Sequence, residues 1–303
     1  MVNATIHGIY PMLYSFYAAD GGLDRGAHRA QTEACIAAGV HGLATGGLAS
    51  DCRRLTVAEK HQTVAWLAED CAGRLPISVT LSEPTAAAQI AMAEVAAAHG
   101  AEWLVLQPPP VKAASDDDLI AFFGTVADAV SLPVGIQNAP EYIGIGLSDE
   151  GLVELHRRHP NVTLVKAEGD AIACGRLARA TDGAMTLFNG RNGIELIDSL
   201  AAGFDGLIPS PDAADVQARI YDHFRAGERE AAMAMFKDIL PLLSFLMISV
   251  DHLLCYGKRL TARRLGLDTV HGRSDVITPD AFGLEVMARW SSKLGPLGAA
   301  PRA

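Results

Sequence analysis

The sequence lacks several features that would assign it to a common functional class. Its 25 Lys and Arg residues are outnumbered by 35 Asp and Glu, the formal net charge is -10, and no basic cluster is present. Because phosphate binding needs a concentrated basic surface, we expect no nucleic-acid partner. No apolar run approaches the roughly 18 residues that a membrane-spanning helix requires, so we expect no membrane contact.

Cysteine and histidine follow no recognisable pattern. The 5 cysteines are an odd number without a Cys-x-x-Cys pair, which favours a reducing compartment over a disulfide framework or a zinc site. The N-terminal residues do not show the charged and apolar regions of a signal peptide, so we expect a cytoplasmic protein. The histidines lack ligand spacing, and no P-loop or Gly-x-Gly-x-x-Gly motif precedes a helix, so we expect neither a metal nor a cofactor.

What the sequence does contain is an alternation of short β-rich runs with longer amphipathic stretches. This alternation is typical of a parallel sheet with crossover helices. The predicted strands lie near residues 6–12, 40–45, 77–81, 103–107, 134–137, 162–166, 185–188 and 206–208. The predicted helices span residues 24–38, 56–72, 84–99, 116–130, 148–159, 170–180, 193–202 and 212–225. Eight such units in about 225 residues predict an α/β fold of the (β/α)8 TIM-barrel type.

The chain is long enough for one barrel or for two smaller domains, and we favour a single barrel over residues 1–226. Residues 227–303 are rich in Ala, Met, Leu and Phe at helical spacing, and we expect them to form a helical extension packed on the barrel. Capping residues mark several helix starts, namely Thr56 with Glu59, Ser115 and Ser148.

Lys166 is the most unusual residue of the chain. It ends the run Asn161-Val-Thr-Leu-Val-Lys166, which is predicted to be a buried parallel strand and should be almost continuously apolar. A buried ammonium without a partner costs several kcal/mol or loses its proton, so Lys166 is a candidate amine nucleophile. The alternative is a strand-end lysine that extends to solvent. The other lysines lie in expected helix surfaces or loops, where solvated charge is the simpler interpretation: Lys60, Lys112, Lys237, Lys258 and Lys293.

Active sites of such barrels lie at the carboxyl ends of the strands, where Lys166 is placed. Glu168 lies two residues further and points to the same side if the chain stays extended. It could form a structural ion pair with the amine or shuttle protons for it. After the seventh strand, Asn189 and Arg191 could hold substrate hydroxyls or a carboxylate, although Arg191 could equally only brace its loop.

Gly46 and Gly47 directly follow the second predicted strand. Two glycines let the backbone turn sharply and present consecutive N–H groups to an anion, here plausibly a carboxylate. Glycine pairs are common in turns, but this one is expected on the same rim as Lys166. Together with residues at the ends of other strands, this loop supplies the predicted substrate-binding residues: Gly47, Leu48, Ala49, Ser50, Gln137, Asn189 and Ile208.

Several short motifs occur in a fixed order. They are Asp20-Gly-Gly-Leu-Asp24, Gly39-Val-His-Gly-Leu43 before the glycine loop, Leu132-Pro-Val134 before Asn138-Ala-Pro140, and Asn161-Val162 before Lys166. This order resembles the dihydrodipicolinate synthase and N-acetylneuraminate lyase superfamily, the class I aldolase barrels, over roughly residues 8 to 265. The resemblance implies that Lys166 is the Schiff-base lysine, that a 2-keto acid such as pyruvate is the ligand, and that the protein is a homotetramer built as a dimer of dimers.

The loop after the second strand departs from that superfamily. The family's Gly-Thr-Thr-Gly-Glu is here Gly47-Leu-Ala-Ser-Asp51, which removes both threonine hydroxyls but keeps the backbone donors of Leu48 and Ala49. The arginine that binds the second carboxylate in dihydrodipicolinate synthases aligns with Tyr142. Paired tyrosines after the fourth strand align with Pro109-Pro110. These departures argue against dihydrodipicolinate synthesis.

A further departure concerns proton transfer. At the position of the family's tyrosine before Asn-x-Pro, this chain has Gln137. The motif Lys166-x-Glu168 is similar to the one in the branch that contains 2-keto-3-deoxy-L-arabonate dehydratase. An iminium at C2 of a 2-keto acid acidifies the C3 protons. Dehydration then needs a base at C3 and an acid at the departing C4 hydroxyl, which Glu168 could serve in turn, whereas the amide of Gln137 cannot act as the base for aldol cleavage.

The favoured interpretation is therefore a Schiff-base lyase that dehydrates a 2-keto-3-deoxy sugar acid. One alternative is a pyruvate-dependent aldolase or a condensation like that of dihydrodipicolinate synthase. Another is a keto-acid-binding barrel without turnover.

Overall fold

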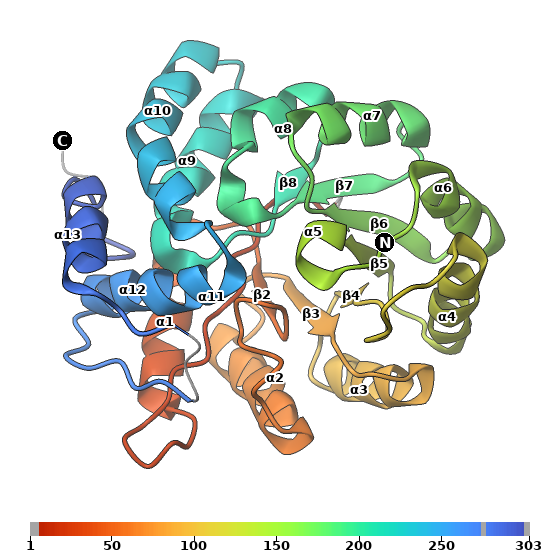
Figure 1. Cartoon of the computed structure of the whole chain (residues 1–303), viewed down its shortest axis with the longest axis horizontal. Coiled ribbons are helices and arrows are strands. Elements are labelled where there is room, and N and C mark those ends of the chain that lie inside the picture. The colour runs from red at the N-terminus through yellow and green to blue at the C-terminus, as the bar shows by residue number, and fades with distance from the viewer. Residues whose placement is uncertain (1–5, 274–276, 300–303) are drawn as a thin grey trace.

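The computed structural model describes residues 6–273 and 277–299, and it confirms the predicted (β/α)8 barrel (Figure 1). Eight parallel strands run in the order β1-β8-β7-β6-β5-β4-β3-β2. A further parallel bridge between Met12 and Ala44 joins the two ends of this order, which closes the ring. The strands are β1 Gly8–Ile9, β2 Leu43–Thr45, β3 Ile77–Leu81, β4 Trp103–Leu106, β5 Val134–Asn138, β6 Val162–Ala167, β7 Thr186–Asn189 and β8 Gly206–Leu207.

Helices surround the strands in the expected alternation. They are α1 Arg25–Ala37, α2 Val57–Cys71, α3 Ala86–Ala98, α4 Asp116–Ala129, α6 Asp149–Arg158, α7 Ala171–Thr181, α8 Leu196–Ala202 and α9 Ala214–Arg225, with a short unpredicted helix α5 at Pro140–Ile143. The predicted caps are present: Thr56 and Ser115 form capping boxes, and the Ser148 hydroxyl accepts a hydrogen bond from the N–H of Gly151.

The strands are buried on both faces because alternate side chains point into the barrel and out to the helices. Inside, the rings of Tyr10, Trp103 and Phe188 contact one another, with Leu164 in the same apolar cluster. Lys166 follows Leu164 by two residues, so its side chain also points into the barrel, one layer closer to the carboxyl ends of the strands.

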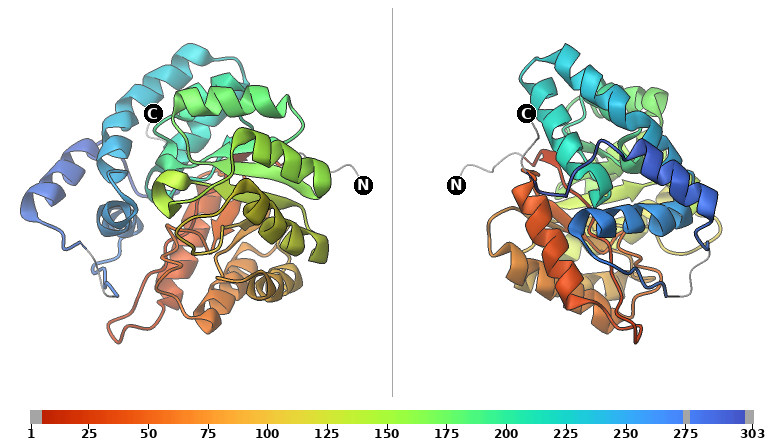
Figure 2. Two further views of the ribbon diagram at one scale, coloured as in Figure 1. Left: turned by 45° about the vertical axis from the view of Figure 1, so that its right-hand side comes forward. Right: turned by 90° about the vertical axis from the view of Figure 1, so that its left-hand side faces the viewer.

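Additional helices follow the barrel, as predicted (Figure 2): α10 Arg229–Leu246, α11 Val250–His252, the π-helical turn η3 Leu253–Gly257, α12 Lys258–Leu265 and α13 Ala281–Trp290. Helix α10 packs on α9 and α13, and α12 packs on α1. The division into two units at residue 227 remains a prediction.

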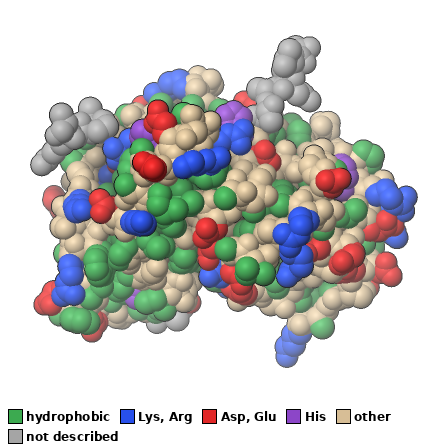
Figure 3. Space-filling model, turned by 90° about the horizontal axis from the view of Figure 1, so that it is seen from above, with side chains coloured by type: hydrophobic (Ala, Val, Ile, Leu, Met, Phe, Trp, Pro, Cys, Tyr) green, Lys and Arg blue, Asp and Glu red, His purple; other side chains and the backbone are tan. Residues whose placement is uncertain are grey.

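Part of this extension presents apolar side chains to solvent. On α13, Phe282, Leu284 and Trp290 are 65%, 37% and 43% exposed. Figure 3 shows hydrophobic side chains gathered over the half of the molecule that carries α10 and α13. Among the described residues no single helix is long and apolar enough to cross a membrane. Only the pair Arg229–Leu246 and Val250–Leu265, bent by 105°, meets the length and composition together.

Two lysines are not where the sequence placed them. Lys60 and Lys258 were expected in solvent, but both are buried. Lys60 Nζ lies 2.9 Å from Glu83 Oε1, and Lys258 Nζ lies 3.8 Å from Asp51 Oδ2. Helical spacing shows which face of a helix is apolar, but it does not show that a carboxylate from a neighbouring loop lies opposite a lysine on that face.

Candidate active site

Lys166 lies at the carboxyl end of β6, between Gln137 of β5 and Phe188 of β7 in the strand register. Its side chain points into the barrel and is 6% exposed. This burial contradicts the alternative of a strand-end lysine in solvent.

Lys166 is not an isolated amine. Its Nζ lies 2.8 Å from Glu168 Oε1, and both side chains are buried. The two-residue spacing accounts for the contact, because the chain stays extended to Ala167 and side chains at i and i+2 share one side. An amine needs a free lone pair to attack a carbonyl carbon, and Glu168 is in position to receive the proton that the amine gives up.

A chain of side-chain amides orients Glu168. Gln137 Nε2 donates to Glu168 Oε1 at 2.7 Å, and Gln107 Nε2 donates to Gln137 Oε1 at 2.9 Å. In turn, the Gln107 backbone oxygen accepts a hydrogen bond from Gln89 Nε2. The sequence places Gln107 at the end of the predicted strand 103–107, but strand spacing does not show which amides meet across the barrel.

Gly190 gives Glu168 the room it needs. A methyl group built on Gly190 would lie 2.6 Å from Glu168 Cγ, so any side chain at this position would displace the carboxylate.

The loop after β2 makes the sharp turn that its glycines predict, but the N–H groups of both glycines already have partners within the protein. Gly46 has a φ of +82°, and its N–H donates to Ser50 Oγ, while the N–H of Gly47 points to Met12 Sδ. In the described part of the chain, the backbone N–H groups of Leu48 and Ala49 form no hydrogen bond. Both residues line the same cavity as Lys166. In the described residues, the free N–H groups of this loop are therefore two positions further along than Gly46 and Gly47.

Ser50 holds this loop in place. Its hydroxyl donates to the Leu13 oxygen at 2.7 Å and accepts from Gly46, and the residue is 1% exposed. The Ser50 hydroxyl is thus committed within the protein, which argues against its predicted contact with substrate. Asp51, with a φ of 60°, accepts a hydrogen bond from the Tyr17 hydroxyl at 3.0 Å and fixes the end of the loop.

The two remaining predicted residues, Ile208 and Asn189, lie in different places. Ile208 lines the cavity. Asn189 is fully buried and faces helix α7 instead, with Nδ2 3.3 Å from Cys174 Sγ. The placement of Asn189 was wrong because Phe188 points into the barrel, so that its neighbour in the strand must point outward.

The residues after β7 that do reach the cavity are Arg191 and Asn192. Both have positive φ, 48° and 51°, which is costly for residues with a side chain. Arg191 Nη1 lies 2.6 Å from Glu141 Oε2 of α5, and its Nε lies 3.1 Å from Glu195 Oε1. Burial is the largest influence and acts to lower the pKa of Arg191, but Glu195, Tyr142 and Glu141 together outweigh it and the net shift is upward.

A buried polar cluster supports the rim near β8. Asp212 accepts hydrogen bonds from the Tyr14 hydroxyl at 3.1 Å, from Asn192 Nδ2 at 3.1 Å and from the Ser210 hydroxyl. Burial, followed by the nearby Asp212 carboxylate, raises the pKa of Tyr14 well above its usual value. Tyr14 is therefore a hydrogen-bond donor here and not a proton acceptor. This cluster was not predicted, because its members lie up to 198 positions apart in the chain.

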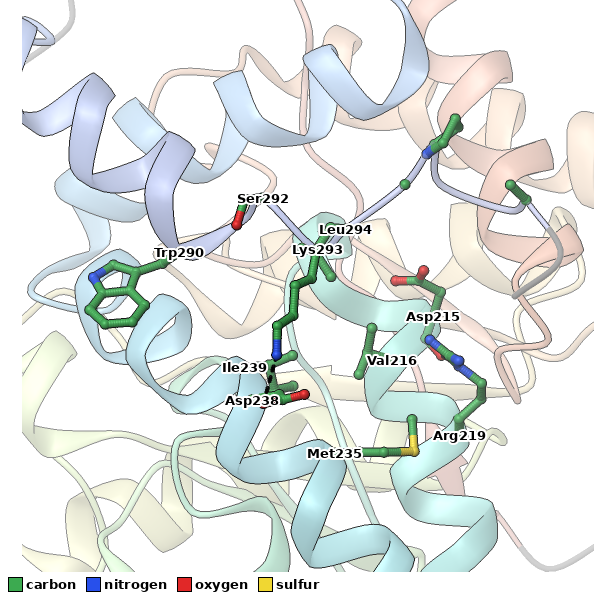
Figure 4. Close-up of a pocket in the computed structure, with 13 residues that line it drawn as sticks. Asp215, Val216, Arg219, Met235, Asp238, Ile239, Trp290, Ser292, Lys293 and Leu294 are labelled. Atoms are coloured by element: carbon green, nitrogen blue, oxygen red, sulfur yellow. Dashed lines mark hydrogen bonds and ion pairs between the residues drawn. The ribbon is translucent and has the colours of Figure 1, made fainter. Parts of the chain in front are cut away.

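The cavity beside Lys166 measures about 30 Å³, and Met247, Val250 and Leu253 of the C-terminal extension cover it. Larger hollows lie elsewhere. One of about 450 Å³ between α5, α6 and α7 shares Glu168 with this cavity. Another, of about 400 Å³, lies between α9, α10 and residues 290–299 and contains the ion pair of Lys293 with Asp238 (Figure 4). None of the residues around that second hollow belongs to the rim, so we place the active site at Lys166.

No group of three or more His, Cys, Asp or Glu side chains within residues 6–273 and 277–299 is arranged to hold a metal ion.

Comparisons with known proteins agree with this architecture. The model of the dihydrodipicolinate synthetase family matches residues 5–272. A 4-hydroxy-tetrahydrodipicolinate synthase of Exiguobacterium sibiricum is 29% identical over 239 residues, which are 78% of this chain and 80% of that protein. A protein of Escherichia coli named as a probable 2-dehydro-3-deoxy-D-pentonate aldolase, YjhH, is 27% identical over 247 residues, with 78% and 80% covered. The crystal structure of a proposed dihydrodipicolinate synthetase from Pseudomonas aeruginosa superposes with a TM-score of 0.86 at 27% identity, covering 94% of this chain and 98% of its own.

Proposed function

The chain belongs to the dihydrodipicolinate synthetase family, and we propose that it is a Schiff-base lyase that dehydrates a 2-keto-3-deoxy sugar acid, with Lys166 as the nucleophile. Membership supports a lyase in general. The finer assignment rests on one observation: in the described part of the chain, the Lys166 amine pairs with the Glu168 carboxylate at 2.8 Å, and the side chain that donates to this carboxylate is the amide of Gln137.

The first step forms the Schiff base. Glu168 takes a proton from Lys166, whose neutral amine attacks C2 of the keto acid. A C–N bond forms, and the carbonyl oxygen leaves as water with two protons, one returned by Glu168 and one from the attacking amine, so that Glu168 is ionised again. The substrate carboxylate would accept hydrogen bonds from the N–H groups of Leu48 and Ala49, which fixes C2 near the amine.

The second step removes water. Glu168 takes a proton from C3, which gives an enamine, and returns it to the C4 hydroxyl as that group leaves. Hydrolysis of the resulting iminium restores Lys166 and releases an unsaturated 2-keto acid. The balance is one proton from C3 and one hydroxide from C4, with no external oxidant or reductant. Gln137 takes no part in proton transfer, but it holds the carboxylate that does.

Trapping tests the Schiff base directly. Incubation with pyruvate and borohydride should add the reduced ligand to Lys166, as located by peptide mass spectrometry, and a Lys166→Ala variant should stay unmodified. The chain offers an internal control in Lys60, another buried lysine with a carboxylate partner at 2.9 Å. Labelling of Lys60 but not Lys166, or no labelling at saturating pyruvate, would remove the mechanism.

The similarity to the Escherichia coli YjhH protein favours a second candidate, cleavage between C3 and C4 by an aldolase. The two candidates differ in their products. Dehydration leaves the carbon chain intact, whereas cleavage releases pyruvate and an aldehyde. Incubation of the enzyme with five-carbon and six-carbon keto-deoxy acids should give unsaturated or tautomerised 2-oxo acids of unchanged carbon number, and release of an aldehyde would decide for the aldolase.

We also propose a cytoplasmic location, since the cysteines are unpaired in the described residues.

A further inference from the structure

Arg191 is the second cation at the cavity, and its partners define what it can bind. It lines the cavity together with Lys166 and Glu168. Its side chain is 19% exposed, so solvent screens it little. Among the described residues, its Nη1 and Nε have carboxylate partners, whereas Nη2 has no hydrogen bond. Arg191 therefore keeps a donor that a ligand oxygen can use.

We propose that Arg191 and Glu195 recognise an uncharged hydroxyl group at the end of the substrate remote from the keto acid, so that the substrate is a monocarboxylic keto-deoxy acid and not a dicarboxylic one. This inference rests on the proposed function and narrows its substrate class.

Carboxylates of the protein already balance the charges of Arg191 and Lys166. The guanidinium of Arg191 already faces two carboxylates, Glu141 at 2.6 Å and Glu195 at 3.1 Å. The two carboxylates together exceed the single charge of Arg191. Glu168 matches the charge of Lys166. The buried carboxylate of Asp212, which Asn192 and Tyr14 contact, adds a further negative charge beside this rim.

A second carboxylate on the ligand would therefore meet two cavity-lining cations, Lys166 and Arg191, that already have carboxylate partners. Like charges placed together in a partly buried site oppose binding. A hydroxyl group fits the same place, because it can accept from Nη2 of Arg191 and donate its own proton to a carboxylate oxygen of Glu195.

The backbone supports a binding role over a simple brace. Arg191, Asn192 and Gly193 all have positive φ, at 48°, 51° and 85°. Two consecutive residues with side chains in this conformation are costly, and such strain concentrates at ligand sites. The conformation brings Arg191 from the end of β7 to α5, so that one side chain spans two loops of the rim.

A matched pair of substrates tests the inference. Two six-carbon 2-keto-3-deoxy acids that differ only at C6, one ending in CH2OH and the other in a carboxylate, are compared by kcat/KM. We expect the hydroxyl-ended acid to be preferred at least about tenfold. Glu195→Gln should reduce this preference several-fold, because it removes one negative charge, while Glu94→Gln on the exposed face of α3 should not. Arg191→Met should raise KM for the hydroxyl-ended acid more than it lowers kcat.

The outcomes separate this inference from the proposed function. Equal or better use of the carboxylate-ended acid, or a ratio that Glu195→Gln leaves unchanged, overturns the inference while trapping of pyruvate at Lys166 still stands. Failure of trapping at Lys166 removes the proposed function and this inference with it.

Discussion

Glu168 has two neighbours that determine its chemistry, Lys166 on one side and Gln137 on the other. In the proposed reaction this single carboxylate carries a proton from the amine to the departing carbonyl oxygen, and then another from C3 to the leaving hydroxyl. The amide of Gln137 keeps the oxygen aimed at the amine throughout, because it can donate a hydrogen bond but cannot titrate.

Replacing Glu168 with Gln tests this role. Glu168→Gln keeps the volume and the contact with Gln137 but removes the proton acceptor, so we expect kcat to fall by about 10²- to 10⁴-fold. The pyruvate adduct at Lys166 should form more slowly, because the amine loses its neighbouring proton acceptor, and mass spectrometry after borohydride reduction at timed intervals would show this. Glu83→Gln is the matched control, because Glu83 is also a buried carboxylate paired with a lysine. A Glu168→Gln enzyme within about threefold of wild-type kcat would exclude Glu168 from proton transfer.

For single residues, the sequence predicted the features that follow from the two-residue period of a strand. The burial of Lys166 and its contact with Glu168 follow from a buried strand and a two-residue repeat. The repeat also contained the information that Asn189 would point outward, once Phe188 was assigned to the interior. The amide chain through Gln107 could not be predicted, since it depends on which side chains of different strands meet.

At the scale of single elements, the loop from Gly46 to Asp51 matters most, because its shape positions the free N–H groups of Leu48 and Ala49. The loop is fixed at both ends: Ser50 bonds to Gly46 and Leu13, and Asp51 bonds to Tyr17. These bonds hold the loop in place without a hydroxyl at Leu48 or Ala49.

Gly46→Ala should disrupt this element. The residue has a φ of +82°, and an added methyl carbon would lie 2.4 Å from the Thr80 backbone oxygen. Gly73→Ala is the matched control, with a φ of +72° and no atom within 4 Å. Both variants pay the cost of the left-handed conformation, about 1–2 kcal/mol. Only Gly46→Ala must move the loop, so it should lose more stability on urea unfolding and show a higher KM for the keto acid. Equal losses for the two variants would contradict the assigned role of this turn.

Helix α2 is tied to the segment before residue 274 by Glu59 and Arg273, 2.8 Å apart. The hydrogen bond from Arg273 lowers the pKa of Glu59 to about 2 from 4.5. A carboxyl group with a lowered pKa stabilises the fold above its unfolded pKa, and this contribution is lost as the pH falls from 4.5 through about 2. Glu59→Gln should therefore lower the Tm near neutral pH, with a difference that shrinks as the pH falls toward 3. Glu33→Gln removes an exposed pair with Arg74 and should change the Tm little. A Tm difference for Glu59→Gln that is independent of pH would contradict this contribution.

The predicted elements agree with the structure where their signals are strong. Strand β3 has its predicted bounds, and the capping boxes of α2 and α4 begin those helices as expected. Helix α5 was missed because its four residues are too few to show a period. The π-helical turn η3 was missed as well, since its apolar residues resemble those of an ordinary helix.

In the whole molecule, one side of the C-terminal extension lies over the cavity and another side faces solvent. On one side Met247, Val250 and Leu253 cover the cavity of Lys166. On the other, α13 buries only Gly283 and Met287 of its ten residues and leaves Phe282, Leu284 and Trp290 exposed. A helix with so little of its apolar surface buried in its own chain is a good candidate for contact with another subunit.

We therefore expect the protein to self-associate through α13, in line with the homotetramer that the family resemblance implies. Sedimentation velocity should give a mass near four times the 32.0 kDa of the chain. Phe282→Glu places a charge on the exposed face and should shift the protein toward smaller species, because burying an unpaired carboxylate at an interface opposes association. Ile172→Glu is the matched control, since Ile172 is 79% exposed but stands on α7, away from the extension. A wild-type protein that sediments as a monomer, or a Phe282→Glu variant that assembles like the wild type, would show that α13 is not the contact surface.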